Sequence, residues 1–269
     1  MYLVLSHVLA FCALCISSFY DVFSEKGDVP DLPAFVAIGA GIILHAIYAF
    51  QAWSVEPFLW MIGTGLAFSA YGWMAYWKGL WGGADAMGVT VLGFAAPYAV
   101  SGPGLIYPVN LFVNIMIVGL VYTVGFAFYR AVRSEGFFER TRDRILEDKR
   151  RIPVEVVAAG LFSLYAGTVD LNPYLYFLAL VFIIFLYRFL KVLEDSEMTK
   201  TVSVEDLEGG EVVAEQGDII EGISEEEIEE LEVEKVEVQE GIRFMPVFPV
   251  ALLMTDVFGA GVFLLLQIF

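Results

Sequence analysis

Long apolar runs separated by short polar segments dominate this chain. An α-helix needs about 20 mostly apolar residues to cross a bilayer, so each such run predicts a membrane span. We expect spans at 1–20, 32–51, 57–77, 84–101, 111–132, 154–171, 173–192 and 246–269. The pattern therefore predicts an all-α polytopic membrane protein with six to eight transmembrane helices.

Two of these spans have weaker patterns than the others. The run at 84–101 is short, and the run at 154–171 contains Glu155 near its start and many alanines and glycines. If the hairpin 154–192 stays peripheral to the membrane, the number of spans falls to six. Residues 1–20 resemble a removable signal peptide in length only, because a basic n-region and a small-x-small cleavage site are missing. We expect this run to be the first helix.

Composition and the placement of basic residues add an orientation. The chain is 58% hydrophobic and has a mean hydropathy of +0.71, which is typical of a membrane protein. Lys26, Lys78 and the basic loop 130–152 lie in alternate loops, whereas the loops 52–56 and 102–110 contain no Lys or Arg. Cytoplasmic loops carry an excess of Lys and Arg, so the basic loops are predicted to be cytoplasmic and the N-terminus to lie outside.

Residues 193–243 differ from the rest of the chain. They contain 19 acidic and three basic residues, a net charge of −16 out of −18 for the whole chain. Alternating residues at 199–204 and 233–238 predict short strands, and Ser224 before three glutamates resembles a helix start. We expect a small acidic α+β cytoplasmic domain here, followed by the last transmembrane helix at 244–269. The alternative is a disordered acidic linker, which high charge also favours.

Two aspartates lie at the ends of apolar spans. Asp21 closes the first span, and Asp85 follows Gly82-Gly83-Ala84 at the start of another. Carboxylates at a bilayer edge are costly and tend to mark ion paths or catalytic centres. Two neighbouring carboxylates can also share one proton, which suits general acid–base chemistry. The alternative interpretation is that each aspartate is a solvated helix end, with Asp85 as an N-cap.

The residues around these aspartates resemble a known family. Asp21 is followed by Val29-Pro30-Asp31, Gly82-Gly83-Ala84-Asp85 opens a helix, and the segment 241–246 precedes the last span. This arrangement resembles the type IV prepilin peptidases, GxGD aspartic membrane proteases, and within them the archaeal preflagellin and prepilin peptidases. The resemblance covers the first five spans and the start of the last one.

The resemblance implies a catalytic pair, Asp21 and Asp85. It also implies that Gly82, Gly83, Ala84 and Pro30 are motif residues, with the glycines forming a flexible helix mouth that a substrate backbone approaches closely. Ala84 stands where the motif has glycine, and the spacing from Asp21 to Pro30 is longer than in the family. The tetracysteine loop of many bacterial relatives is absent, so we expect no metal and no cofactor.

The function implied by the resemblance is that of a membrane aspartic endopeptidase. Its partners would be archaellin or type IV pilin-like precursors with a basic leader and an apolar N-terminal helix, cleaved at the cytoplasmic face of the cell membrane. We expect contact with membrane lipid and none with nucleic acid. Two alternatives differ in class: a cation- or proton-coupled transporter that uses Asp21, Asp85 and Asp256, and a scaffold that recruits basic partners through its acidic domain.

Other polar residues in the spans have less specific interpretations. Cys12 and Cys15 form a CxxC, but they lie in an apolar helix without a second pair, so we expect structural thiols. His7 and His45 are expected to have packing roles, without an acidic partner. Asp256 lies inside the last span and is expected to form part of a polar interior or to pair with another helix.

Overall fold

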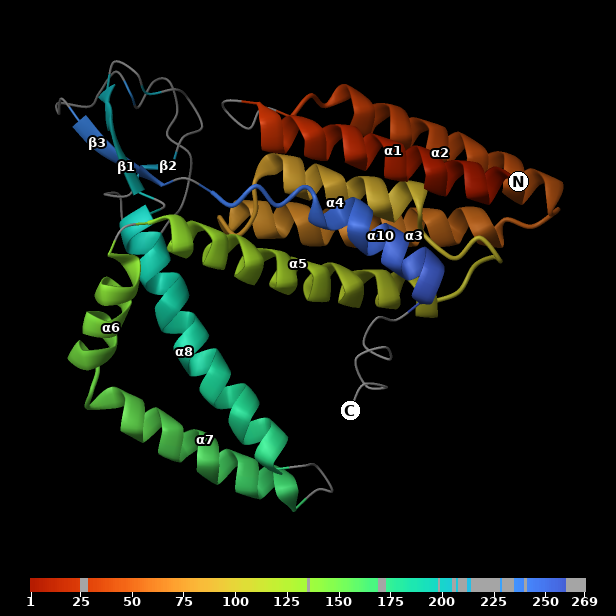
Figure 1. Cartoon of the computed structure of the whole chain (residues 1–269). Helices are drawn as coiled ribbons and strands as arrows, with labels where there is room; N and C mark the ends of the chain where they lie inside the picture. Colours follow the sequence, from red (N-terminus) through yellow and green to blue (C-terminus); the bar gives the residue numbers. More distant parts are fainter. Residues whose placement is uncertain are drawn as a thin grey trace. The chain divides into compact units, whose positions relative to one another are not determined.

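The computed structural model describes residues 1–24, 29–134, 136–168, 173–197, 199–204, 207, 212–213, 228, 235–239 and 241–259. Most of the described residues are helical, and they form two compact units (Figure 1). The first unit contains Met1–Thr123, Gln216–Glu221 and Gly241–Phe269, and the second contains Val124–Glu215 and Gly222–Glu240.

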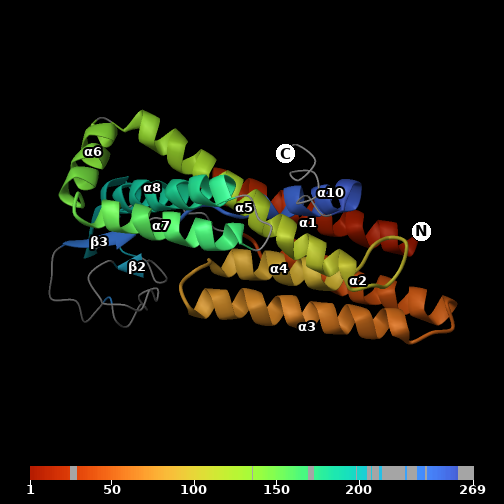
Figure 2. The ribbon, with the colours of Figure 1, turned by 90° about the horizontal axis from the view of Figure 1, so that it is seen from below.

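Six helices contribute to the first unit. They are α1 (Tyr2–Phe23), α2 (Leu32–Gln51), α3 (Glu56–Trp77), α4 (Gly83–Ala95), α5 (Ile106–Arg133), which continues into the second unit, and α10 (Val247–Phe258). Helices α1 and α2 lie side by side as a hairpin, and α3 runs beside α4 (Figures 1 and 2). Helix α4 contacts α1, α2, α3 and α10, so it is the central helix of this unit.

Several helices are long and apolar enough to cross a membrane. Within the described chain they are α1, α2, α5 and the stretch Tyr176–Leu193. These helices support the expectation of a helical membrane protein. Each expected span contains a helix, and the last expected span extends beyond residue 259 into residues outside the described part.

Helix α4 is shorter than the span expected at 84–101. Its 13 residues measure about 20 Å at 1.5 Å per residue, against a bilayer core of about 30 Å. The helix ends at Ala95, and Ala96 adopts a non-helical conformation with φ −131° and ψ 54°. Pro97 explains this end, because proline disfavours a helical conformation in the residue before it. The apolar run therefore continues beyond the helix that it predicts.

Close backbone contacts fix α4 in place. A Cβ atom on Gly41 of α2 would lie 2.9 Å from the Ala95 Cα atom and 3.0 Å from the Phe94 carbonyl oxygen. A Cβ atom on Gly72 of α3 would lie 3.0 Å from the Ala86 carbonyl oxygen. Small residues at such points allow helix backbones to approach closely in a membrane. Helices α2 and α3 therefore hold α4, and with it Asp85, at short range.

The second unit contains a helical region and a small sheet. Its elements are the end of α5, α6 (Phe137–Glu147), α7 (Arg151–Gly167), α8 (Pro173–Glu197), β1 (Thr199–Ser203), β2 (Val212–Val213) and β3 (Lys235–Gln239). The strands form an antiparallel sheet in the order β1-β3-β2. Strands β1 and β3 confirm the two strands expected at 199–204 and 233–238. Residues 224–227, where a helix start is expected, lie outside the described residues.

The segment 130–152, which the sequence suggests is a basic loop, contains the helix α6. This helix begins at Phe137, whose buried side chain packs with Ala127, Ala131 and Phe189. The few apolar side chains of this polar segment are a weak sequence signal, but the buried Phe137 ring packs one end of the helix against its neighbours. The charged residues of α6 remain largely exposed.

Helices α7 and α8 form a hairpin, which matches the two helical segments expected at 154–171 and 173–192. Arg188 of α8 is buried, and its Nη2 atom lies 2.8 Å from Glu155 Oε2 of α7. Its Nε atom lies 3.4 Å from Asp148 Oδ2, just before α7. The carboxylate that makes the sixth span unfavourable in the sequence is thus paired with a cation, which lowers the cost of burying both charges.

Two glycines of α2 provide a matched test of this packing. Gly41→Ala should lower the thermal unfolding midpoint of the detergent-solubilised protein, since overpacking costs about 1–3 kcal/mol. Gly39→Ala is the control, because nothing lies within 4 Å of a Cβ atom placed there. Alanine has the higher helix propensity, so that variant should be neutral or slightly stabilised. Equal midpoints for the two variants would contradict the close α2–α4 contact.

Candidate active site

Asp21 lies in the last turn of α1 and is buried, with 8% of its surface exposed. Its Oδ2 atom accepts a hydrogen bond of 3.1 Å from the backbone N–H of Met245. Met245 belongs to the segment that leads into α10, 224 residues further along the chain. A backbone amide therefore satisfies one oxygen of this carboxylate, which leaves the rest of the group available for chemistry.

Asp85 lies at the third residue of α4 and is 7% exposed. The helix begins at Gly83 with Gly82 as its N-cap, so Asp85 is inside the first turn and is not itself the N-cap. Its Oδ2 atom accepts a 3.2 Å hydrogen bond from the Gly82 N–H. A carboxylate in this position is favoured by the positive end of the helix dipole.

Asp21 and Asp85 lie near the same end of the first unit. They come from the C-terminal end of α1 and the N-terminal end of α4, and the charge of Asp21 acts on Asp85. The Tyr122 hydroxyl of α5 also lies within the electrostatic range of both aspartates and of Arg243. Two carboxylates, one phenol and one guanidinium therefore share a neighbourhood at one end of the first unit.

A cavity of about 190 Å³ adjoins this neighbourhood. Ala84, the residue before Asp85, lines it together with Ser17, which precedes Asp21 by one helical turn, and Met245. The expected motif residue Pro30 lines it as well, beside Asp31. All of the remaining lining residues are small or apolar: Ala13, Leu14, Val29, Ala34, Met87, Gly88 and Val91. The cavity is therefore largely apolar, and it is lined by neighbours of Asp21 and Asp85 and not by the two aspartates themselves.

The two motif glycines lie at the N-terminal end of α4. Gly82 has φ −73°, a value open to any residue, so its conformation does not require glycine. Its small size has a clearer use, because a Cβ atom there would lie 3.5 Å from Asp85 Oδ2. A Cβ atom on Gly83 would lie 3.7 Å from the Tyr76 ring. Glycine at 82 therefore keeps one side of the Asp85 carboxylate uncovered by a side chain.

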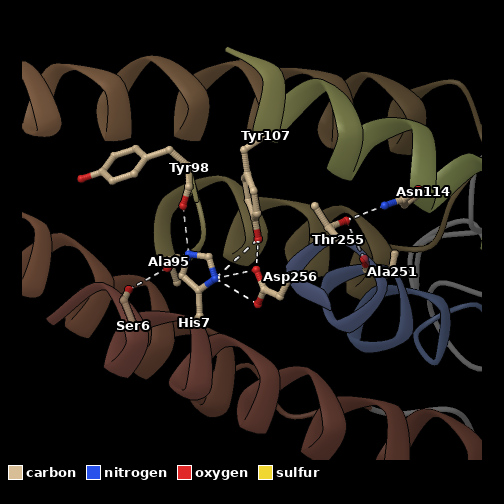
Figure 3. A network of polar contacts seen from close by, with 9 residues as sticks. All are labelled: Ser6, His7, Ala95, Tyr98, Tyr107, Asn114, Ala251, Thr255 and Asp256. Carbon is tan, nitrogen blue, oxygen red and sulfur yellow. Dashed lines mark hydrogen bonds and ion pairs between the residues drawn. The ribbon is translucent and has the colours of Figure 1, made fainter. Parts of the chain in front are cut away.

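A second polar cluster joins α1, α5 and α10 (Figure 3). His7 Nδ1 lies 3.0 Å and 3.1 Å from the two carboxylate oxygens of Asp256, and Tyr107 donates a 2.6 Å hydrogen bond to Asp256 Oδ1. His7 Nε2 lies 3.0 Å from the Tyr98 carbonyl oxygen. The pairing of Asp256 with another helix is thus confirmed. The expectation that His7 has no acidic partner is wrong.

The geometry of this cluster places a proton between His7 and Asp256. A carbonyl oxygen only accepts hydrogen bonds, so His7 Nε2 must carry a hydrogen that it donates to Tyr98. His7 Nδ1 then faces a carboxylate at 3.0 Å, and two lone pairs at that distance repel unless a proton lies between them. The pair is therefore held by a charge-assisted or shared-proton hydrogen bond.

The other polar residues of the spans have simpler surroundings. His45 is fully buried, its Nδ1 atom lies 2.8 Å from the Gly41 carbonyl oxygen, and its ring packs edge-on against Tyr98. Cys12 and Cys15 are free thiols. Among the described residues, no group of three or more His, Cys, Asp or Glu side chains is arranged to hold a metal ion.

The groups that contact Asp21 could not be identified from the sequence. The Met245 amide has no signature, because every residue except proline has a backbone N–H. Arg243 and Tyr122 lie near the site, and only the family-like segment 241–246 drew attention to this part of the chain. No family model, curated protein or solved structure matches the chain.

The His7–Asp256 pair can be tested by a double-mutant cycle. His7→Ala and Asp256→Ala should each lower the free energy of unfolding. The double variant should lose less of this free energy than the sum of the two single losses. Residues in one hydrogen-bond network typically couple by about 0.5–3 kcal/mol. The measurement is the free energy of unfolding in detergent.

Asn114 supplies the control for this cycle. Its side chain donates hydrogen bonds to Thr255 Oγ1 and the Gly259 carbonyl oxygen, on the same helix end but without a contact to His7. The effects of His7→Ala and Asn114→Ala should therefore be close to additive. Additive losses in the His7–Asp256 cycle would show that the two side chains do not interact.

Proposed function

We propose that this protein is a membrane aspartic endopeptidase. The observation that carries the proposal is the pair of buried aspartates, 64 residues apart in the chain, whose charges interact beside a small cavity. Burial of two interacting carboxylates costs free energy, and ionisable groups at such positions tend to mark functional sites. Two nearby carboxyl groups that hold one proton between them suit aspartic peptide hydrolysis, which supports this proposal.

The reaction divides between the two carboxyl groups. The ionised one removes a proton from a water molecule as the water oxygen attacks the carbonyl carbon of the scissile peptide bond, and the protonated one donates its proton to the carbonyl oxygen. The gem-diol that results then collapses. The newly protonated carboxyl group gives its proton to the nitrogen, the other carboxylate takes a proton from one hydroxyl, and the C–N bond breaks to release an amine and a carboxylic acid. The Met245 and Gly82 amides orient the two carboxylates throughout.

The substrate that we propose is an archaellin or type IV pilin-like precursor. Its basic leader would lie in the cytoplasm and its apolar helix in the membrane, so that the scissile bond reaches the two aspartates at the boundary. The cavity beside Ala84 and Pro30 would receive a small side chain next to that bond. Asp31 lines the same cavity and adds a negative charge near a basic leader.

This proposal includes a topology. Six to eight helices would cross the cell membrane, with the aspartate pair and the acidic region 193–243 both on the cytoplasmic side. The distribution of Lys and Arg supports this orientation, because Lys26, Lys78 and the cluster from Arg130 to Arg151 follow alternate spans. Asp21 and Asp85 lie at the span ends nearest these basic loops.

Replacement of each aspartate tests the proposal. Asp21→Asn and Asp85→Asn keep the shape of the side chain but remove the exchangeable proton. Each should lower the rate of leader cleavage by at least about 100-fold, the scale of general acid–base catalysis. The assay is co-expression with a candidate precursor, followed by a gel shift that separates precursor from mature protein.

Asp256→Asn is the matched control. It removes a third aspartate from the same unit, and Asp256 is engaged with His7 and Tyr107 at a separate cluster. Cleavage per folded molecule should therefore remain near the wild-type level. Near-normal cleavage by either Asp21→Asn or Asp85→Asn would refute the dyad, and equal losses in all three variants would favour a carboxylate relay such as a transporter uses.

A further inference from the structure

Arg243 makes three contacts with the end of α1. Its Nη1 atom donates hydrogen bonds to the carbonyl oxygens of Asp21 at 2.9 Å, Val22 at 2.7 Å and Ser24 at 2.9 Å. These residues are about 220 positions away in the sequence and belong to the turn that carries the Asp21 side chain. One guanidinium group therefore gathers the carbonyl groups of the turn on which Asp21 sits.

The carbonyl groups at the end of helix α1 gain a partner from a distant part of the chain. The last carbonyl groups of any helix have no partner inside the helix and carry a partial negative charge. The last turn of α1 contains no basic residue that could compensate them. Arg243 supplies both the hydrogen-bond donor and the positive charge from elsewhere in the chain. The conformation of the turn that contains Asp21 thus depends on a side chain 222 residues away in the sequence.

The residues around Arg243 fix its own position. Tyr122 donates a 2.7 Å hydrogen bond to the Arg243 carbonyl oxygen. The next residue, Phe244, packs its ring with the rings of Trp81, Tyr122 and Phe248. Met245 then donates its backbone N–H to the Asp21 carboxylate. Arg243 therefore bonds to the backbone of Asp21, Phe244 packs in an aromatic cluster, and Met245 bonds to the carboxylate of Asp21.

We propose that Arg243 is a positioning residue for Asp21. It does not touch the reacting atoms, and it acts by fixing the α1 end so that the Asp21 carboxylate keeps its alignment toward Asp85. This inference rests on the proposed peptidase function. A misplaced carboxylate should slow the chemical step and leave substrate binding largely unchanged, because misalignment on the order of 1 Å can cost about 100-fold in rate.

The kinetic test uses the full-length protein in membranes or detergent with a purified precursor. Arg243→Gln should lower kcat by about 10- to 100-fold with KM changed by less than about twofold. Arg243→Lys should recover much of the loss, since an ammonium group keeps the charge and three donors. Arg142→Gln is the control, because Arg142 is exposed on α6 and its side chain contacts the neighbouring Asp143.

A second readout does not depend on catalysis. The Ser24 N–H bonds to the Tyr20 carbonyl oxygen at 2.9 Å and reports on the α1 end. Hydrogen exchange of the amides at 20–24 should accelerate in Arg243→Gln, while the amides of α2 keep their wild-type rates. This comparison decides the contact even if no precursor is cleaved, an outcome that would instead count against the proposed function.

Two results would overturn the inference while leaving the peptidase function intact. In the first, the wild type cleaves precursor and Arg243→Gln has the same kcat as Arg142→Gln. In the second, Arg243→Gln and Arg243→Lys lose activity equally and both lose thermal stability. That pattern would indicate a role in folding alone, since conservation of the charge would then bring no recovery.

Discussion

The structure of the first unit depends on hydrogen bonds to carboxylates that lie in apolar helices. Asp21, Asp85 and Asp256 lie in or beside such helices, and an unpaired charge there costs several kcal/mol. Two of them accept hydrogen bonds from backbone amides, and the third accepts from a side chain. Asp21 accepts from the Met245 amide, Asp85 from the Gly82 amide, and Asp256 from Tyr107 with His7 beside it. Two of these three sets involve α10 or the segment before it.

Helix α10 and the segment before it are therefore joined to α1 at two points. Arg243 and Met245, before α10, bond to the end of α1 that carries Asp21. Asp256, inside α10, contacts His7 near the start of α1. Between these points, Phe248, Ala251 and Leu252 of α10 are buried in the hydrophobic core of the unit. Helix α10 and the segment before it therefore contact α1 near both of its ends.

The positions of the helices were predictable because apolar runs are local signals. The sequence also draws attention to Asp21 and Asp85, since an aspartate at the end of such a run is unusual and the glycines before Asp85 resemble a known motif. The partner of His7 was not, because Asp256 is 249 residues away and no periodicity links them. The end of α4 at Ala95 depends on one residue, Pro97, within an apolar stretch. The hydrogen bond to Asp21 comes from a backbone amide, which has no sequence signature.

The central claim is that Asp21 and Asp85 face one another across one site. A direct measurement is intramolecular crosslinking with a short bifunctional thiol reagent, in a chain with Cys12→Ser and Cys15→Ser that carries Asp21→Cys and Asp85→Cys. We predict that this pair crosslinks, and that bound precursor increases the yield as the helix mouth closes on it. The pair Asp21→Cys and Asp256→Cys should not crosslink, because Asp256 contacts His7, 14 residues and about 20 Å along α1 from Asp21. Failure of the first pair to crosslink, with and without precursor, would contradict a shared site.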